Sequence, residues 1–402
     1  MRIAFIIEHL DPNRGGMERS AVDFLTELAD LGPEIHVVTQ TSVWDHPGIQ
    51  VHPLGMSGWT DEMQYRGFVD RAQGFLASRS WDVVHAVRPC LSCDMYQPRG
   101  GIVKVGQERT VATRRNGVAR LMRHVGLLFD AKERLLATLE HRLLTGASSP
   151  VVVVPSEYVR RQLEERYRLP DERIKRVFNG VRITLSDSGE RELIRRRVRD
   201  EVGVPADALV AIFVGHNFRR KGLARLIESL TKPPAHDWYL LIVGRAAISY
   251  YERSVEQAQI KDRVRFLGSR TDVESLYCAA DVCVLPTYND PCSRTILEAL
   301  SLGLPCITTA YDGSSECIRD GEHGFVIDSP ESVDALANAL DKLRDGSTRR
   351  HMSEQAMGLR HFLSMRRHAA EVLSLYREIA DSRPLASRSV QAGDGSRPAS
   401  SG

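Results

Sequence analysis

One stretch of the chain indicates how it folds: Leu285-Pro-Thr-Tyr-Asn-Asp-Pro-Cys-Ser-Arg-Thr-Ile-Leu-Glu-Ala-Leu-Ser-Leu-Gly-Leu-Pro305. The run 282–285 at its start is continuously apolar and predicts a buried strand. A polar loop follows. We expect a helix to begin near Ser293 and to end at Gly303 and Pro305, because Gly and Pro commonly end helices. This order of strand, loop and helix is typical of a parallel sheet covered by helices.

Two carboxylates flank the start of this predicted helix. Asp290 lies in the loop, and Glu298 follows it eight residues later. A helix N-terminus offers free N–H groups and the positive end of its dipole to a diphosphate. The two carboxylates can accept hydrogen bonds from sugar hydroxyls on either side of that diphosphate. The stretch therefore predicts a nucleotide-sugar site.

Strands alternate with helices along the whole chain, which predicts an α/β protein with two doubly wound parallel sheets. We expect residues 1–180 to form the first domain and residues 181–352 the second. A last helix over roughly 353–380 is expected to bring the segment 353–382 back to the first domain, and the tail 383–402 has a disordered composition. The expected strands are residues 3–7, 35–39, 83–86 and 151–154, then 210–214, 238–243, 264–267, 282–285 and 306–309.

The composition excludes several classes of function. The 402 residues carry 54 basic and 52 acidic side chains, a net charge of +2, which gives no general case for nucleic-acid binding. The apolar runs are far shorter than the roughly 20 residues of a membrane span. The seven cysteines are scattered, and only Cys90 and Cys93 form a CxxC. We expect no disulfide framework, no metal site and a cytoplasmic location.

A glycine-rich loop follows the first predicted strand, in Asp11-Pro-Asn-Arg-Gly-Gly-Met-Glu-Arg-Ser20. Gly15 and Gly16 would let the backbone approach a ligand closely, beside the N-terminus of the next helix. A plain turn explains these residues equally well. The loop matches neither G-x-G-x-x-G nor a Walker sequence. Thr39 and Gln40 stand where a dinucleotide-binding domain carries an acidic residue, which disfavours a dehydrogenase.

A basic loop follows the first strand of the second half, in Val214-Gly-His-Asn-Phe-Arg-Arg-Lys-Gly222. Arg219, Arg220 and Lys221 occupy a tight turn that Gly222 relaxes. Arg gives forked hydrogen bonds to phosphate, and Lys gives a point charge. A solvated basic loop is the alternative, but open α/β sheets bind ligands at the carboxyl ends of their strands, which favours a phosphate site.

A third loop contains Arg270, in Ser269-Arg-Thr-Asp-Val-Glu-Ser-Leu-Tyr-Cys-Ala-Ala-Asp281. We expect Thr271 or Asp272 to cap a short helix there. Such a loop can hold a nucleobase through backbone groups. A simple capped connector is an equally good interpretation.

These loops resemble those of the retaining glycosyltransferases of family four, whose fold is GT-B, two Rossmann-like domains facing across a cleft. The resemblance covers roughly residues 1–380 and is most specific from Asp290 to Pro305, which is similar to the family's segment of two carboxylates with seven residues between them. Gly15-Gly16, Lys221-Gly222 and Ala280-Asp281 also occur in the expected order. Within the family, Gly-Gly-Met-Glu-Arg and Phe-Arg-Arg-Lys-Gly are similar to segments of lipopolysaccharide core glucosyltransferases, which add glucose to inner-core heptose.

The resemblance implies roles for the matching residues. Arg220 and Lys221 would neutralise the leaving diphosphate, and Asp290 would hold the transferred sugar. Glu298 would hold the ribose hydroxyls, and Gly16 would lie against the donor phosphates. The implied donor-binding residues are Gly15, Gly16, Arg270, Ser293, Arg294, Thr295 and Glu298. The expected co-substrate is a nucleotide-diphosphate sugar such as UDP-glucose, and we expect no cofactor.

The chain departs from the family pattern at three places. The family's first carboxylate is usually Glu, whereas this chain has Asp290, which is shorter by one methylene. The loop after the first carboxylate usually has glycines, and here it has Pro291 and Ser293. The acid or His of the first domain that faces the cleft has no clean match. His85, Asp94 and Arg99 are the candidates for a base or a sugar contact, and a satisfied core histidine is the alternative for His85.

The segment 109–144 is basic and amphipathic. Its cations include Arg114, Arg115, Arg120 and Arg123, interleaved with apolar residues. Such a stretch can lie on an anionic membrane surface. The alternative is that its apolar face packs on the domain and the arginines are solvated.

The residues and the resemblance together predict a metal-independent retaining glycosyltransferase. It would move a hexose, in particular glucose, to a lipopolysaccharide-core or other cell-envelope glycan or glycolipid, at the inner face of the plasma membrane. Two alternatives remain open, a sugar-nucleotide epimerase of the same fold and a non-catalytic nucleotide-sugar-binding protein. The change from Glu to Asp290 and the missing first-domain base support the second alternative.

Overall fold

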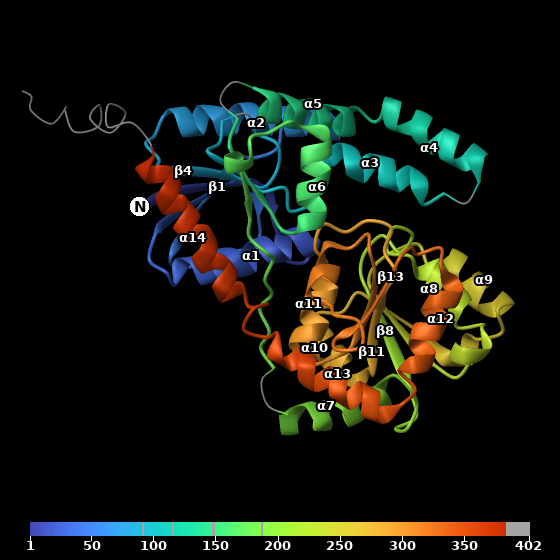
Figure 1. Cartoon of the computed structure of the whole chain (residues 1–402). Helices are drawn as coiled ribbons and strands as arrows, with labels where there is room; N and C mark the ends of the chain where they lie inside the picture. Colours follow the sequence, from blue (N-terminus) through green and yellow to red (C-terminus); the bar gives the residue numbers. More distant parts are fainter. Residues whose placement is uncertain (91, 115, 147–148, 186–187, 383–402) are drawn as a thin grey trace, which may run out of the picture.

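The protein contains two parallel sheets with helices packed on their faces (Figure 1). The computed structural model describes residues 1–90, 92–114, 116–146, 149–185 and 188–382. The strands are β1 (Arg2–Leu10), β2 (Glu34–Ser42), β3 (Ile49–Pro53), β4 (Val83–Ala86), β5 (Met95–Tyr96), β6 (Val151–Val154), β7 (Ile174–Arg176), β8 (Val210–Val214), β9 (Tyr239–Val243), β10 (Val264–Gly268), β11 (Val282–Leu285), β12 (Cys306–Thr309) and β13 (Gly324–Ile327).

The strand order confirms the predicted pair of doubly wound sheets. The first sheet runs β3-β2-β1-β4-β5-β6-β7 and the second β10-β9-β8-β11-β12-β13, with parallel pairing throughout. The order reverses direction between β1 and β4 in the first sheet and between β8 and β11 in the second. Such switch points are where open α/β sheets bind ligands at the carboxyl ends of the strands.

Fourteen α-helices occur among the described residues. They are α1 (Gly16–Ala29), α2 (Asp61–Ala77), α3 (Val103–Ala112), α4 (Gly117–Phe129), α5 (Ala131–Thr145), α6 (Glu157–Arg166), α7 (Ser188–Glu201), α8 (Leu223–Ser229), α9 (Ser249–Gln257), α10 (Val273–Ala279), α11 (Arg294–Ser301), α12 (Val333–Lys342), α13 (Gly346–Gly358) and α14 (Met365–Asp381). In Figure 1, α3 and α4 form an arm that projects from the first domain.

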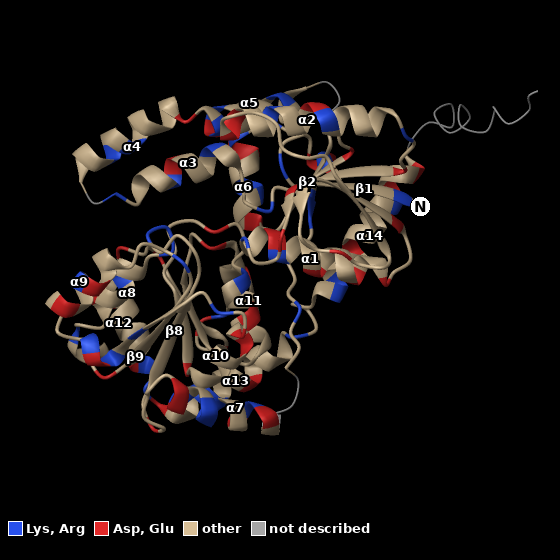
Figure 2. Ribbon diagram, turned by 180° about the vertical axis from the view of Figure 1, so that it is seen from behind, with Lys and Arg blue, Asp and Glu red and all other residues tan. Residues whose placement is uncertain are grey.

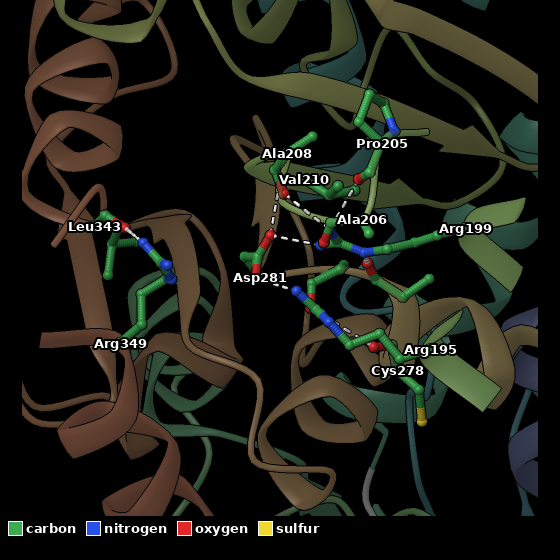
Figure 3. A network of polar contacts seen from close by, with 12 residues as sticks. Arg195, Arg199, Pro205, Ala206, Ala208, Val210, Cys278, Asp281, Leu343 and Arg349 are labelled. Carbon is green, nitrogen blue, oxygen red and sulfur yellow. Dashed lines mark hydrogen bonds and ion pairs between the residues drawn. The ribbon is translucent and has the colours of Figure 1, made fainter. Parts of the chain in front are cut away.

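The arginine-rich helix α7 is fixed to the second sheet through Asp281, at the amino end of β11 (Figure 3). The Asp281 carboxylate accepts hydrogen bonds from Arg195 at 2.7 Å and from Arg199 and the Val210 N–H at 2.8 Å. Arg199 is only 2% exposed, and a buried charge is tolerated only when it is paired and hydrogen-bonded. Because this pair lies at the opposite end of the strand from the ligand-binding edge, we assign it a structural role.

The predicted single helix over 353–380 is wrong. The chain forms α13 and α14 instead, and the residues between them are held against Val181. The Val181 N–H donates to the Leu363 carbonyl at 2.8 Å, and the Met365 N–H donates to the Val181 carbonyl at 2.9 Å. Ser364 then caps α14 by accepting a hydrogen bond from the Arg367 N–H. These bonds replace the helical ones that a continuous helix would need.

Helix α14 packs on the first sheet although it follows the second domain in the sequence. Its residues Ala369, Val372 and Tyr376 belong to the same buried cluster as Phe5 and Phe24. Figure 1 shows α14 crossing beside α1. The tail 383–402, which the sequence predicts to be disordered, lies outside the described residues.

Candidate active site

The Lys221 ammonium and the Asp290 carboxylate form a buried ion pair between two loops of the second sheet. Lys221 ends the basic loop after β8, and Asp290 lies in the loop after β11. Each residue is 8% exposed. The Asp290 backbone is fixed in both directions, since its N–H donates to the Tyr311 carbonyl and its carbonyl accepts from the Gly313 N–H, both at 2.9 Å. The fold thus brings together two predicted site residues that are 69 positions apart.

Gly222 allows these two loops to touch. Its φ is +79°, a left-handed conformation that favours glycine. A Cβ at this position would lie 1.9 Å from the Pro286 carbonyl oxygen. No other residue could therefore keep Lys221 this close to the end of β11.

Arg220 lies beside Lys221 with its charge uncompensated. It forms no ion pair with any residue that the structure describes, and its Nε is buried without a hydrogen-bond partner there. The Arg220 carbonyl is held by the Tyr288 N–H at 2.8 Å and by the Thr287 hydroxyl at 3.1 Å. The backbone is therefore fixed while the guanidinium remains available for an anion.

The N-terminus of α11 lies next to the Lys221–Asp290 pair. Ser293 is its N-cap residue, as predicted, and the Ser293 N–H donates to Asp312 at 3.1 Å. The Ser293 hydroxyl is buried and has no partner among the described residues. Thr295 turns inward and donates to the Val214 carbonyl at 3.1 Å, so its hydroxyl ties α11 to the end of β8.

Asp312 is a site residue that the sequence did not indicate. It is fully buried and accepts hydrogen bonds from the N–H groups of Ser293 and Ser314 and from the Thr308 hydroxyl. Burial and, after it, the nearby Asp290 carboxylate raise the pKa of Asp312 to about 6, although the Lys221 charge and the hydrogen bonds from Ser314 oppose this rise. Its position follows from a bridge between two loops, which no local pattern predicts.

Arg294 and Glu298 are held in a network that reaches the first domain. Arg294 pairs with Glu298 at 2.8 Å, and Glu298 also accepts from the Tyr277 hydroxyl at 3.2 Å. The same Arg294 nitrogen lies 2.8 Å from Asp23 of α1. A Cβ at Gly16 would lie 3.9 Å from the Arg294 Cδ, so the glycine loop of the first domain faces α11 of the second.

Arg270 is not brought into this cluster. Its guanidinium pairs with Glu201 at 2.8 Å and with Asp272 at 2.7 Å. Asp272 is the N-cap residue of α10, as predicted, but its carboxylate binds Arg270 and makes no side-chain cap hydrogen bond. Arg270 therefore joins the loop before α10 to the end of α7.

The three first-domain candidates have different surroundings. His85 is fully buried, packs edge-on against Phe5 and contacts the Tyr376 hydroxyl, and burial lowers its pKa well below the usual value. His85 is thus a core histidine, the alternative that the sequence left open, although its Nε2 has no hydrogen-bond partner among the described residues. Asp94 accepts a hydrogen bond from the Val84 N–H at 2.8 Å, at the amino end of β4 and thus away from the ligand-binding edge.

Arg99 lies nearest to the domain interface of the three. It donates to the Ser20 hydroxyl of α1 at 2.7 Å and stacks over Phe24. Burial lowers its pKa to about 10, and the Arg294 charge contributes to the lowering. Its Nη2 has no hydrogen-bond partner among the described residues.

Four cations come from the elements described above. Arg220 and Lys221 follow β8, Arg294 begins α11, and Arg99 contacts α1. Lys221 and Arg294 are ion-paired, whereas Arg220 forms no ion pair among the described residues. The Arg220 Nε, the Arg99 Nη2 and the Ser293 hydroxyl have no hydrogen-bond partner there. Such a set can bind and neutralise a diphosphate, because Arg and Lys form charge-assisted hydrogen bonds to phosphate. Within the described ranges, no group of three or more His, Cys, Asp or Glu side chains could hold a metal ion.

Two family models match the two halves of the chain. Residues 14–185 match the model of Glycosyltransferase Family 4, and residues 194–358 match that of Glycosyl transferases group 1. The first match includes β2 to β7 of the first sheet, and the second includes all six strands of the second sheet.

Individual proteins agree with this match. The chain is 27% identical over 393 residues to the lipopolysaccharide glucosyltransferase WaaG of Escherichia coli K12, covering 94% of this chain and 96% of that protein. A crystal structure of WaaG superimposes with a TM-score of 0.78 at 23% identity, covering 93% of this chain and 99% of that one. The Anabaena protein HepE, solved with UDP and glucose, gives a TM-score of 0.69 at 18% identity over 94% of this chain and 100% of that one.

Proposed function

Because the chain belongs to the GT-B glycosyltransferases with a family 4 first domain and a group 1 second domain, we propose that it transfers a hexose from a nucleotide-diphosphate sugar with retention of anomeric configuration. The observation that carries this proposal is the buried Lys221–Asp290 pair with the free Arg220 beside it. A cation for the leaving diphosphate and a carboxylate for the sugar hydroxyls lie side by side there.

In the proposed reaction, the acceptor oxygen bonds to the anomeric carbon as the bond from that carbon to the diphosphate oxygen breaks. The acceptor proton passes to the leaving phosphate oxygen on the same face of the sugar. Arg220, Lys221 and the N-terminus of α11 stabilise the charge that develops on the diphosphate, which is usually a large contribution to catalysis. Glu298 accepts hydrogen bonds from the ribose, and Asp290 from the transferred sugar. These steps require no covalent intermediate.

The donor is a UDP-hexose, in particular UDP-glucose, and the acceptor is a lipopolysaccharide-core or other cell-envelope glycan. WaaG is a lipopolysaccharide glucosyltransferase, and HepE was solved with UDP and glucose, which supports this choice. The neutralising charges come from the protein, so the reaction proceeds without a divalent metal.

The proposal includes peripheral binding to the inner face of the plasma membrane through α4. No residue of α4 is buried, and Leu121, Met122 and Phe129 are 63%, 71% and 81% exposed. The apolar face therefore does not pack on the domain. Figure 2 shows blue cationic segments on this projecting helix, which contains Arg120 and Arg123 and no acidic residue. Arg115, which we also expect to contribute, lies outside the described residues. No described helix is long and apolar enough to cross a bilayer.

Two alternatives use the same fold, a sugar-nucleotide epimerase and a non-catalytic nucleotide-sugar-binding protein. The shorter carboxylate at Asp290 favours the non-catalytic binding protein. A turnover panel of nucleotide sugars, read by release of nucleoside diphosphate with and without excess chelator, separates the three. Release of UDP with transfer or hydrolysis of the hexose supports the transferase. An epimerised sugar identifies the epimerase. Binding that raises the melting temperature without turnover identifies the non-catalytic binding protein.

A further inference from the structure

The switch point of the first sheet contains a charged cluster that the donor site does not use. The paired register of β1 and β4 ends at Ile6 and Ala86. Glu8 lies two residues further along β1, and Arg88 lies two residues beyond the end of β4, so both lie at the point where the strand order reverses. Lys132, from the start of α5, lies over them. Ligands bind open α/β sheets at this kind of position.

Glu8 is a buried carboxylate surrounded by positive groups. It is 4% exposed, and its Oε1 lies 2.6 Å from the Lys132 ammonium and 3.4 Å from the His9 Nε2. Arg88 approaches its other oxygen at 4.0 Å. Burial alone would raise the pKa of Glu8, but hydrogen bonds with His9 and Lys132 and the Arg88 charge lower it to about 2. The carboxylate is thus ionised and can accept hydrogen bonds.

The two cations retain an open side. The Lys132 and Arg88 side chains are 26% and 33% exposed, whereas that of Glu8 is 5% exposed. The Arg88 Nε is buried and has no hydrogen-bond partner among the described residues. One cation would neutralise Glu8, so the second leaves the cluster of Glu8, Arg88 and Lys132 with a net charge of +1.

The surrounding residues fix this geometry. The Tyr65 hydroxyl donates to the Pro89 carbonyl at 3.0 Å, next to Arg88, and the Tyr65 ring lies 5.6 Å from the Lys132 ammonium. Such preorganisation is expected of a binding site, because it reduces the entropy lost when a ligand binds.

The cluster lies on the edge of the sheet that faces the donor site. The loop after β1 leads into α1 at Gly16, which approaches Arg294 of the second domain. A ligand at the ends of β1 and β4 therefore lies on the side where an acceptor must meet the donor sugar.

We propose that Glu8, Arg88 and Lys132 form an acceptor site that selects a sugar carrying an anionic group. Arg88 and Lys132 bind the anion, and Glu8 accepts hydrogen bonds from neighbouring hydroxyls. The inference rests on the proposed transferase function, since it supplies that reaction's second substrate. A phosphate and a carboxylate on the sugar share the required chemistry.

The test measures binding of three probes, mannose, mannose 6-phosphate and mannuronate, to protein saturated with UDP so that the donor phosphate site is filled. Titrations followed by ligand-observed NMR should show the anionic probes binding roughly ten-fold or more tightly than mannose, because charge-assisted hydrogen bonds are strong. The stronger of the two anionic probes identifies phosphate or carboxylate as the natural group.

Variants locate the effect. Arg88→Gln and Lys132→Gln should each remove most of the preference for the anionic probes over mannose. Lys132→Arg should retain this preference. Arg134→Gln removes an exposed cation on the same helix and should leave the preference unchanged. UDP affinity should stay the same in all four. Equal binding of the three probes to the wild type, or an unchanged preference in both Gln variants, would overturn the site. Failure to bind UDP at all would instead refute the proposed function.

Discussion

Arg294 of the second domain lies 2.8 Å from Asp23 of the first, while the same guanidinium pairs with Glu298 at 2.8 Å. One side chain thus joins the expected ribose-binding carboxylate to α1 of the facing domain. Both partners are largely buried, and removing one partner of a buried pair leaves an uncompensated charge. We therefore expect donor binding at Glu298 to be coupled to the contact between the two domains through Arg294.

We predict that Asp23→Asn lowers turnover by about ten-fold, because it removes a buried ion pair across the interface, while the affinity for free UDP changes little. Steady-state kinetics and calorimetry measure the two quantities. Glu27→Gln, on the same helix and 3.7 Å from Arg182, is the matched control and should behave as the wild type. A large loss of UDP affinity in Asp23→Asn would show that Arg294 is not the link.

Arg220→Ala is expected to lower turnover by about 100-fold with little change in melting temperature, because Arg220 has no ion pair to lose within the described chain. Lys221→Ala should lower turnover as much but also destabilise the fold, since it leaves Asp290 buried without its cation. Adding Asp290→Asn to Lys221→Ala should restore the melting temperature and not the activity. Near-normal turnover at saturating donor in Arg220→Ala would exclude Arg220 from the site.

Glu298→Gln should weaken binding of UDP alone, whereas Asp290→Asn should leave that affinity intact and lower hexose transfer. The reason is their separation across the N-terminus of α11, with Glu298 beside Tyr277 and Asp290 beside Lys221. Calorimetry with UDP, followed by kinetics with the full donor, distinguishes the two effects. Equal losses of UDP affinity would mean that the roles are not divided in this way.

Asp312 should make the protein less stable as pH rises. Its carboxyl has a pKa of about 6 in the folded state, above the value of 3.8 in the unfolded chain, so the folded state binds more protons between these values. Its contribution to stability is therefore complete below pH 4 and is lost as pH rises through 6. Asp312→Asn should gain stability relative to the wild type between pH 4 and pH 7, by on the order of 2 kcal/mol.

Urea unfolding at both pH values measures this difference, and Asp328→Asn, an exposed residue, serves as the control. An unchanged difference between wild type and Asp312→Asn across this window would show that the Asp312 carboxyl does not titrate there.

Binding to anionic vesicles should depend on α4. Replacing Arg120 and Arg123 by Gln should weaken co-sedimentation, since each cation near an anionic surface contributes on the order of 1 kcal/mol and salt reduces it. Leu121→Glu should release the protein further, while Leu193→Glu, equally exposed on α7, should not. A wild-type protein that stays in solution at low salt would contradict the proposed membrane contact.

The sequence predicts the parts of the fold that are coded by continuous apolar runs. All nine expected strands are present, whereas β3, β5, β7 and β13 were missed. Three of these four lie at sheet edges. Polar residues interrupt β3 and β7, β13 is a short run of four residues beginning with Gly, and β5 has only two residues. The break between α13 and α14 was missed because it depends on Val181, far away in the sequence.

The same distinction applies to the candidate site. Lys221, Asp290 and Ser293 follow strands directly, so their place at the carboxyl edge could be read from local order. Asp23, Asp312 and Glu8 could not, because each acquires its partner only when distant loops, the two domains or α5 come together. His85 ends a strand at that edge and looked accessible, but α14 covers it with Tyr376.

Proton NMR during turnover of UDP-glucose in excess chelator tests the central claim most directly, because it resolves the two anomers of released glucose before they interconvert. The account predicts equimolar release of UDP and glucose, with the α-anomer formed first, and about 100-fold slower release with Arg220→Ala. A wild-type rate of UDP release no higher than that of Arg220→Ala would contradict the account. So would formation of the β-anomer of glucose first, because the account requires a retaining transfer stabilised by Arg220 and Lys221.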